Sequence, residues 1–124
     1  NERGKMKPSS AKAKGRNFQN KVREMIIDKL GINEHDIKTA VMGESGMDII
    51  LSKAGRETFP YAVECKKVEK INIWKCFDQA SENSDDLTPL LVFSKNHSKV
   101  MVCFEFKDLL DLINNSNGFK RITK

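Results

Sequence analysis

The sequence has few of the residues that build disulfide frameworks or zinc sites. Its 124 residues include three cysteines and two histidines. Cys65, Cys76 and Cys103 are far apart and contain no C-x-x-C pair, so neither a disulfide framework nor a zinc knuckle is expected. His35 and His97 lie in predicted loops, and two isolated histidines cannot supply a zinc-hydrolase site, so we interpret both as surface residues. A reducing cytoplasm is the expected compartment.

Long hydrophobic runs are also missing. No apolar run approaches the roughly 20 residues that a membrane span needs, and no signal-peptide pattern is present. Hydrophobic residues make up 39% and charged residues 31% of the chain, which is typical of a folded globular protein. A length of 124 residues suits one core and leaves little room for a separate recognition module. We therefore expect a flexible basic arm at 1–12 and a single domain at 13–124.

Positive charge is concentrated near the beginning of the chain. Residues 1–23 carry eight Lys or Arg residues against one acid, Glu2, whereas the chain as a whole has a net charge of only +5. A basic arm that leads into a basic helix is a typical electrostatic footprint for phosphate groups, and a solvated tail is the alternative. The side chains expected to bind DNA are Lys12, Lys14, Arg16, Lys21, Arg23 and Lys75.

Apolar periodicity predicts alternating helices and strands. Helices are expected over 13–30, 73–83 and 107–114, and strands over 37–42, around Asp48, around Glu64, and over 89–93 and 100–104. We expect Gly31 to end the first helix and Asn72 to cap the second. This order, α-β-β-β-α-β-β-α, predicts the mixed α/β (α+β) class with a mixed central sheet and flanking helices.

Several apolar residues have a predicted place in the core. Trp74, Phe77 and Ala80 recur at helical spacing, which predicts a buried stripe or a dimer seam, with base stacking as the alternative for the aromatics. The residues interpreted as core filler are Met25, Met42, Met47 and Met101.

Two carboxylates and a lysine are expected to meet at one point of the sheet. The turn-rich segment 53–57 predicts a hairpin that brings Asp48 beside the next strand. Side chains alternate along a strand, so Glu64 and Lys66 point the same way. Carboxylates suit Mg²⁺, and an ammonium group can offset charge that develops on a phosphate. The cluster is typical of metal-assisted phosphodiester hydrolysis, and an ordinary solvated ion pair is the alternative.

The order of these segments resembles the PD-(D/E)xK nuclease superfamily, and within it the small archaeal-type and phage-encoded Holliday junction resolvases. The matching segments are Lys14-Gly15-Arg16-x-Phe18, Gly43-x-x-Gly46-x-Asp48-Ile49, Val63-Glu64-Cys65-Lys66 and Trp74-Lys75-x-Phe77-Asp78-Gln79-Ala80. The resemblance implies a restriction-endonuclease-like core. It also implies that Asp48 and Glu64 bind Mg²⁺ or Mn²⁺, with the carbonyl of Cys65 as a candidate third ligand. Lys66 would orient the attacking water.

Two further implications concern the edge of the site. Gln79 is expected to help shape it, and Ser45 and Glu44 are expected to approach the scissile phosphate, although Glu44 fits a solvent-facing turn residue equally well. Gln19 departs from the family, which usually has a glutamate there to complete the metal site. A neutral amide adds no charge, so a second ion would bind more weakly. Either one ion suffices, or Glu24 or Glu44 substitutes, or activity has been lost; Glu24 lies about 140° around the helix and is a poor substitute.

The leading hypothesis from the sequence is a metal-dependent endonuclease that cuts branched DNA, such as a four-way junction, as a homodimer and leaves 5′-phosphate ends. One alternative is a nuclease for linear or single-stranded DNA in repair or restriction. Another is a catalytically silent nucleic-acid-binding module. Gln19 keeps this last alternative open, whereas the retained Asp48, Glu64 and Lys66 count against it.

Overall fold

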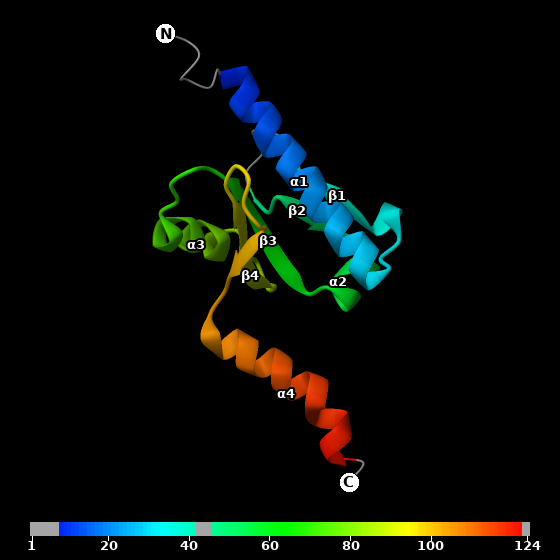
Figure 1. Ribbon diagram of the computed structural model, residues 1–124. Coiled ribbons are helices and arrows are strands. Elements are labelled where there is room, and N and C mark those ends of the chain that lie inside the picture. Colours follow the sequence, from blue (N-terminus) through cyan, green and yellow to red (C-terminus); the bar gives the residue numbers. More distant parts are fainter. Residues whose placement is uncertain (1–7, 42–45, 123–124) are drawn as a thin grey trace.

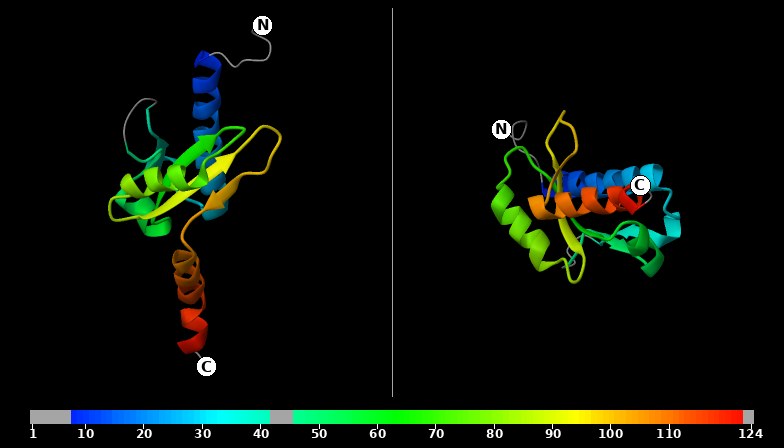
Figure 2. Two further views of the ribbon diagram at one scale, coloured as in Figure 1. Left: turned by 90° about the vertical axis from the view of Figure 1, so that its left-hand side faces the viewer. Right: turned by 90° about the horizontal axis from the view of Figure 1, so that it is seen from below.

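The protein is described by a computed structural model that covers residues 8–41 and 46–122 (Figure 1). Its elements are α1 (Pro8–Leu30), a short 3-10 helix η2 (Glu34–Asp36), β1 (Ile37–Thr39), β2 (Ile49–Leu51), α2 (Lys53–Thr58), β3 (Tyr61–Lys67), α3 (Ile73–Glu82), β4 (Thr88–Ser94), β5 (Met101–Cys103) and α4 (Phe106–Ile122). The sheet contains both parallel and antiparallel strand pairs, and helices lie on both of its sides. This arrangement confirms the predicted fold class and agrees with a restriction-endonuclease-like core (Figure 2).

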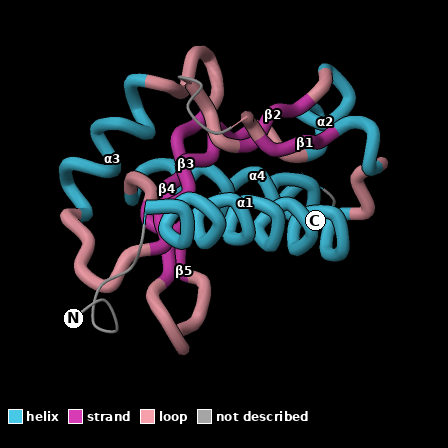
Figure 3. Tube along the Cα trace, turned by 90° about the horizontal axis from the view of Figure 1, so that it is seen from above, coloured by secondary structure: helices cyan, strands magenta, loops and turns pink. Residues whose placement is uncertain are grey.

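β3 is the strand around which the others are arranged. It pairs in parallel with β4 from Tyr61 opposite Thr88 to Lys67 opposite Ser94, and β4 pairs antiparallel with β5. β1 and β2 form a second, antiparallel pair. In Figure 3, this pair lies beside β3 and next to α2. The two sheets meet where the N–H of Asp48 donates to the carbonyl of Val63 at 2.9 Å.

The predicted hairpin between the strands near Asp48 and Glu64 is wrong. Residues 53–58 form helix α2, whose N-cap Ser52 accepts a hydrogen bond from the N–H of Gly55 at 3.1 Å. A Cβ at Gly55 would lie 2.7 Å from the carbonyl oxygen of Asp36, so glycine permits α2 to approach η2 closely. The glycine that resembles a turn signal in the sequence is therefore a packing residue.

Helix α1 covers β3 and supplies much of the core. Phe18 and Val22 are buried and pack with buried residues of β1, β2 and β3. The helix begins at Pro8, so residues 8–12 of the predicted arm are helical, while residues 1–7 lie outside the described part. Gly31 ends the helix as predicted: its φ is +67°, and its N–H donates to the carbonyl of Ile27 at 2.8 Å.

Other local predictions are confirmed in α3 and in the loops. The Oδ1 atom of Asn72 accepts a hydrogen bond from the N–H of Lys75 at 3.1 Å, as an N-cap should. Ala80 is buried and Phe77 is half-buried. His35 and His97 are both exposed, in agreement with their interpretation as surface residues.

Some predicted core residues lie on the surface instead. The Trp74 side chain is 81% exposed, so the predicted burial of this end of the stripe is wrong within the single chain. Met25 and Met101 are also exposed, Met47 is half-buried, and Met42 lies outside the described residues. Periodicity locates an apolar face but does not say whether the chain itself covers that face.

Helix α4 is longer than the predicted 107–114 and leaves the body of the protein (Figure 1). Figure 2 shows it extending away from the sheet and from α1, and it shares no extensive contact with another described element. Among the helices that the structure describes, none has the length and apolar character needed to cross a membrane.

Candidate active site

Asp48 lies at the junction of the two sheets. Its carbonyl accepts from the N–H of Ala40 at 2.9 Å, as part of the β1–β2 pairing, and its own N–H donates to Val63 of β3. Its carboxylate oxygen Oδ2 accepts from the N–H of Cys65 at 2.7 Å. Backbone and side chain therefore both fix Asp48 against β3, directly beside the residue that follows Glu64.

Glu64 is buried in the middle of β3. Only 4% of the residue is exposed, and its Oε2 atom is fully buried without a hydrogen-bond partner among the described residues. Burial, and after it the charge of the neighbouring Asp48 carboxylate, raise the pKa of Glu64 to about 7. Lys66 and a side-chain hydrogen bond from Asn83 act in the opposite direction. A buried carboxyl group in this setting favours a proton or a cation as its partner.

Burial and two neighbouring groups act on the carboxyl group of Asp48. Burial raises the pKa of the Asp48 carboxyl group, while the hydrogen bond from Cys65 and the charge of half-buried Lys66 lower it. Asp48, Glu64 and Lys66 are thus within electrostatic reach of one another, as the sequence predicts. No hairpin brings Asp48 close to Glu64 and Lys66. The hydrogen bonds of Asp48 to Val63 and Cys65 of β3 do so instead. The catalytic roles of the three residues stay predictions.

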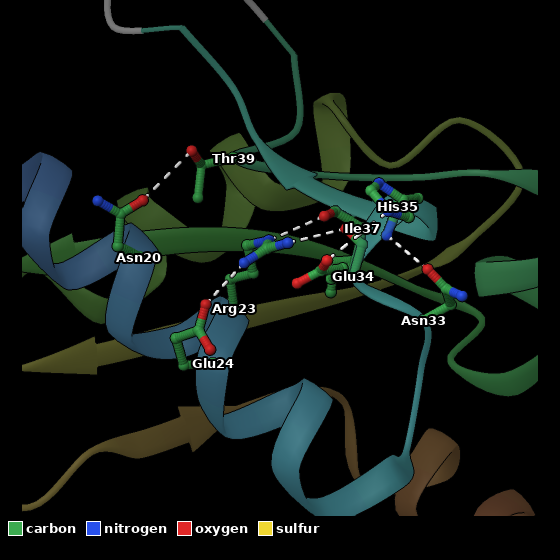
Figure 4. Close-up of polar contacts among 8 residues, drawn as sticks. All are labelled: Asn20, Arg23, Glu24, Asn33, Glu34, His35, Ile37 and Thr39. Atoms are coloured by element: carbon green, nitrogen blue, oxygen red, sulfur yellow. Dashed lines mark hydrogen bonds and ion pairs between the residues drawn. The ribbon is translucent and has the colours of Figure 1, made fainter.

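Gln19 is buried on the face of α1 that runs along β1. The neighbouring Asn20 accepts from the hydroxyl of Thr39 at 3.4 Å, and Arg23, one turn on, donates to the carbonyl of Ile37 at 2.8 Å (Figure 4). These contacts place this part of α1 against β1, the strand whose end pairs with Asp48. Only 8% of Gln19 is exposed, and its buried Oε1 atom has no hydrogen-bond partner among the described residues.

Glu24 does not replace the missing helix glutamate. It is exposed, and its carboxylate pairs with Arg23 at 2.6 Å on the outside of the helix (Figure 4). Glu44 and Ser45, the other residues predicted near the scissile phosphate, lie outside the described residues.

The side-chain oxygens in and near this cluster suit a hard divalent cation. In the described part of the chain, no group of three His, Cys, Asp or Glu side chains could hold a metal. Mg²⁺ needs fewer protein ligands, because it retains waters and uses substrate phosphate oxygens. Asp48 and Glu64 supply two carboxylates, and the buried Oε2 of Glu64 accepts no hydrogen bond from any residue that the structure describes. These residues therefore fit one Mg²⁺ or Mn²⁺ ion.

Cys65 contributes through its backbone. Burial raises the pKa of its thiol, and the carboxylates of Asp48 and Glu64 raise it further, so the sulfur remains a neutral thiol. Its N–H is occupied by Asp48. The predicted use of its carbonyl as a metal ligand stays a prediction.

On α3, the structure brings Asn83 to the cluster rather than Gln79. Gln79 is exposed, whereas Asn83, one turn later at the C-cap, interacts with Glu64. The sequence predicts Asn83 only as the end of the helix. Because it lies four residues after Gln79, on the same face of the helix, it could have been proposed as a second residue near Glu64. A role of Gln79 in shaping the site stays a prediction.

The basic residues divide into separate groups. Lys14 and Lys21 line an open groove of about 520 Å³ together with Ser10, Ala13, Asn17, Phe18, Lys67 and Asn96. The ammonium group of Lys67 lies 5.6 Å from the centre of the Phe18 ring. Sequence reasoning missed Lys67 and Asn96 because the groove joins three distant parts of the chain.

The other predicted DNA-binding residues lie elsewhere. Arg16 lines a second hollow with Asn20, Thr39, Ala40 and Val41. Arg23 is half-buried and bonded to the carbonyls of Ile37 and Glu34, both at 2.8 Å, so it serves as a structural link between α1 and β1. Lys12 is exposed on α1, and Lys75 is exposed on α3.

Comparison with known proteins agrees with this geometry. A family model described as “Phage putative PDDEXK endonuclease” matches residues 10–123, nearly the whole chain. Searches of curated proteins and of solved structures gave no significant match. The matched region contains Asp48, Glu64 and Lys66, the residue types that give such nucleases their signature. The chain therefore belongs to this phage PDDEXK endonuclease family.

Proposed function

We propose that this nuclease is a metal-dependent DNA endonuclease that cuts branched DNA, such as a four-way junction, and acts as a homodimer. The observation that carries the proposal is the meeting of Asp48, Glu64 and Lys66 where the two sheets join. The unpartnered, buried Oε2 of Glu64 is the strongest single feature, because a folded protein rarely leaves such an atom without a ligand.

Asp48 and Glu64 would hold Mg²⁺ or Mn²⁺, with the Cys65 carbonyl as a candidate third ligand. When bound, the ion supplies Lewis-acid stabilisation of the charge that develops on the scissile phosphate. Cys65 contributes its N–H, which fixes the Asp48 carboxylate, and Asn83 orients Glu64. Gln19 presents an amide oxygen that is suited to hold a water molecule beside the carboxylates.

Lys66 has a different task from the carboxylates. Its ammonium group is close enough to Asp48 and Glu64 to lower the pKa of both. In the reaction, this charge would orient the attacking water and offset negative charge on the phosphate. Hydrolysis with this arrangement leaves a 5′-phosphate and a 3′-hydroxyl, as the resemblance to the resolvases implies.

The groove along α1 provides a path for a DNA backbone. Ser10, Lys14, Asn17 and Lys21 recur at intervals of three or four residues, so they form one stripe along the helix. Lys67 closes the other side of the groove; it follows Lys66 on β3, so its side chain points to the opposite face of the strand, toward Phe18 of α1. Ammonium and amide groups of this kind contact phosphates and read the shape of DNA rather than the base sequence, which favours a branched substrate over a sequence-specific one.

A silent DNA-binding module is the second candidate, and Gln19 is the observation that favours it. An amide stands at the position where the resemblance implies a carboxylate, whereas basic residues line the groove along α1. A nuclease that acts equally on linear or single-stranded DNA is the third.

A cleavage assay separates these candidates. A labelled four-way junction, a matched duplex and a single strand are incubated with Mg²⁺ or Mn²⁺, using the wild type, Glu64→Gln and the control Glu57→Gln, which changes an exposed glutamate on α2. The proposal predicts paired symmetric cuts in the junction alone, lost in Glu64→Gln and kept in the control. Equal cutting of all three DNAs would remove the junction preference. Binding without cutting would identify a silent module.

A further inference from the structure

Helix α4 carries an apolar stripe that the rest of the described chain does not cover. Phe106, Leu109, Leu110 and Ile113 recur at positions i, i+3, i+4 and i+7, so they share one face of the helix. Phe106 is 71% exposed, and the other three are between 36% and 49% exposed. Most helical stability in proteins comes from packing an apolar face, so we expect this face of α4 to have a partner.

An apolar groove lies at the base of the same helix. Its volume is about 470 Å³, and its lining includes Ile73, Trp74 and Phe77 of α3 together with Cys103 and Phe104 at the end of β5. Trp74 is 81% exposed at the edge of this groove. A tryptophan that is so exposed beside other aromatic residues is typical of a binding surface.

We propose that these two features are the two halves of a homodimer interface, which we call the α4–Trp74 surface: the exposed apolar side chains of α4 and the groove around Trp74. In this arrangement, α4 of one protomer lies in the groove of its partner, and the partner's helix lies in the first groove. A two-fold axis generates both contacts at once. Each α4 then packs in the groove of the other chain, and both apolar surfaces are covered within one dimer.

The exposed area is of the size that a dimer needs. Trp74, Phe106 and the exposed aliphatic residues of α4 together present on the order of 600 Å², if a large free side chain presents about 150–250 Å². Standard interfaces bury about 800 Å² per partner, and the polar rim supplies the difference.

The charges around the surface also favour a second copy over nucleic acid. Lys107 and Glu105 line the groove, and the ammonium group of Lys107 lies 3.7 Å from the carboxylate of Asp108, so the rim carries both signs. A two-fold pairing can match such a rim with itself, whereas a DNA backbone requires a positive surface such as the α1 groove. The inference rests on the homodimer of the proposed function but does not depend on nuclease activity.

Trp74 makes the test direct, because it is the only tryptophan in the chain. The full chain, without DNA or metal, is diluted from about 100 to about 1 µM while the emission maximum of Trp74 and the sedimentation coefficient are followed, since a dimer must dissociate by mass action. We expect a species of twice the chain mass at high concentration. We also expect the tryptophan emission to shift to the red as that species dissociates.

Two variants complete the test. Leu110→Glu should lower the dimer affinity at least tenfold, so the red shift of the Trp74 emission should occur at a concentration at least tenfold higher than in the wild type. Met25→Glu is the matched control, because it places the same charge on an exposed apolar position of α1 and should leave the dimer intact. Circular dichroism checks that both variants remain folded.

Two results would overturn the inference. A wild type that is monomeric at every concentration would exclude a second copy as the partner. A dimer that tolerates Leu110→Glu with unchanged emission would place the interface elsewhere. DNA cleavage by the wild type is measured in a separate assay. A monomeric wild type would therefore remove the homodimer from the proposed function but would not contradict the nuclease chemistry.

Discussion

The carboxylate of Asp48 accepts a hydrogen bond from the backbone N–H of Cys65 at 2.7 Å. This bond ties the start of β2 to the strand that carries Glu64 and Lys66. It also gives Asp48 two separable properties: its charge, which a metal requires, and its acceptor oxygen, which β3 requires.

Two substitutions at Asp48 should separate these properties. Asp48→Asn keeps an oxygen for Cys65 and removes the charge, so it should abolish cleavage with little loss of stability. Asp48→Ala should also abolish cleavage and should lower the free energy of unfolding by about 1–3 kcal/mol, because the N–H of Cys65 loses its partner. Urea denaturation and the cleavage assay measure both effects. Equal stability of the two variants would show that the hydrogen bond contributes little.

Stability of the metal-free protein should fall as the pH rises through the range in which Glu64 ionises. The pKa of Glu64 is raised from 4.5 to about 7, so the folded state binds more protons than the unfolded state between these values. Stability from this group is therefore present below about pH 4.5 and lost progressively up to about pH 7. Denaturation at pH 5 and pH 8 measures the loss, which we expect to be on the order of 2 kcal/mol.

The variant Glu64→Gln provides the reference for that experiment. It has no ionisable group at this position, so its stability should vary less with pH than that of the wild type. Glu57→Gln, at an exposed position, should behave as the wild type does. An identical pH dependence in Glu64→Gln would contradict the raised pKa.

Removal of the Lys66 ammonium group should affect the reaction more than the metal. Lys66→Ala should reduce the cleavage rate by about 100-fold, because a positioned charge acts mainly on the transition state. Mn²⁺ affinity, measured by calorimetry, should change only modestly. Lys70→Ala is the control, since it removes an exposed lysine from the loop after β3. A large loss of Mn²⁺ affinity in Lys66→Ala with an unchanged rate at saturating metal would reverse this assignment.

The α1 groove should bind DNA through phosphates. Replacement of Lys14 and Lys67 by alanine should weaken binding to junction and duplex alike. It should also reduce the slope of log affinity against log salt by about two, one for each lost phosphate contact. Lys53→Ala, on an exposed position of α2, should leave the slope unchanged. If the double variant retained the full slope, the groove would not be the DNA path.

Restoring a carboxylate at position 19 should strengthen metal binding. Gln19→Glu adds a negative charge at a buried oxygen that has no hydrogen-bond partner within residues 8–41 and 46–122, so it should destabilise the metal-free protein by about 1–3 kcal/mol. Mn²⁺ should bind more tightly and should recover that stability, because the ion binds only the folded state. Thermal denaturation with and without Mn²⁺ measures both effects. Destabilisation that Mn²⁺ cannot reverse would mean that Gln19 does not face the metal.

The sequence predicts well the features that depend on neighbouring residues. The cap at Asn72, the helix end at Gly31 and the alternation that buries Val63 and orients Glu64 all follow from local chemistry. The predicted approach of Asp48 to β3 does occur, but hydrogen bonds to Val63 and Cys65 cause it and not a hairpin. The sequence does not distinguish a glycine that forms a turn from a glycine that permits a close helix contact. The segment 53–57 therefore predicts a turn, although it forms α2.

Features that depend on distant parts of the chain could not be predicted in this way. The basic groove joins α1 to Lys67 and Asn96, and no sequence spacing connects these residues. The exposure of Trp74 likewise depends on where α4 goes after β5. Arg23 carries the same charge as its neighbours, but the position of β1 makes it a structural residue.

The junction at Asp48 also links the chemistry to local unfolding. β1 and β2 form a separate sheet, and Asp48 joins that sheet to β3 through its backbone and its side chain. A fluctuation that lifts this pair from β3 would carry Asp48 away from Glu64 and separate the two proposed metal ligands without unfolding the core. Divalent cations should therefore slow amide hydrogen exchange at Asp48 and Cys65 more than in the distant part of α1, so that assembly of the site becomes a measurable equilibrium within the native protein.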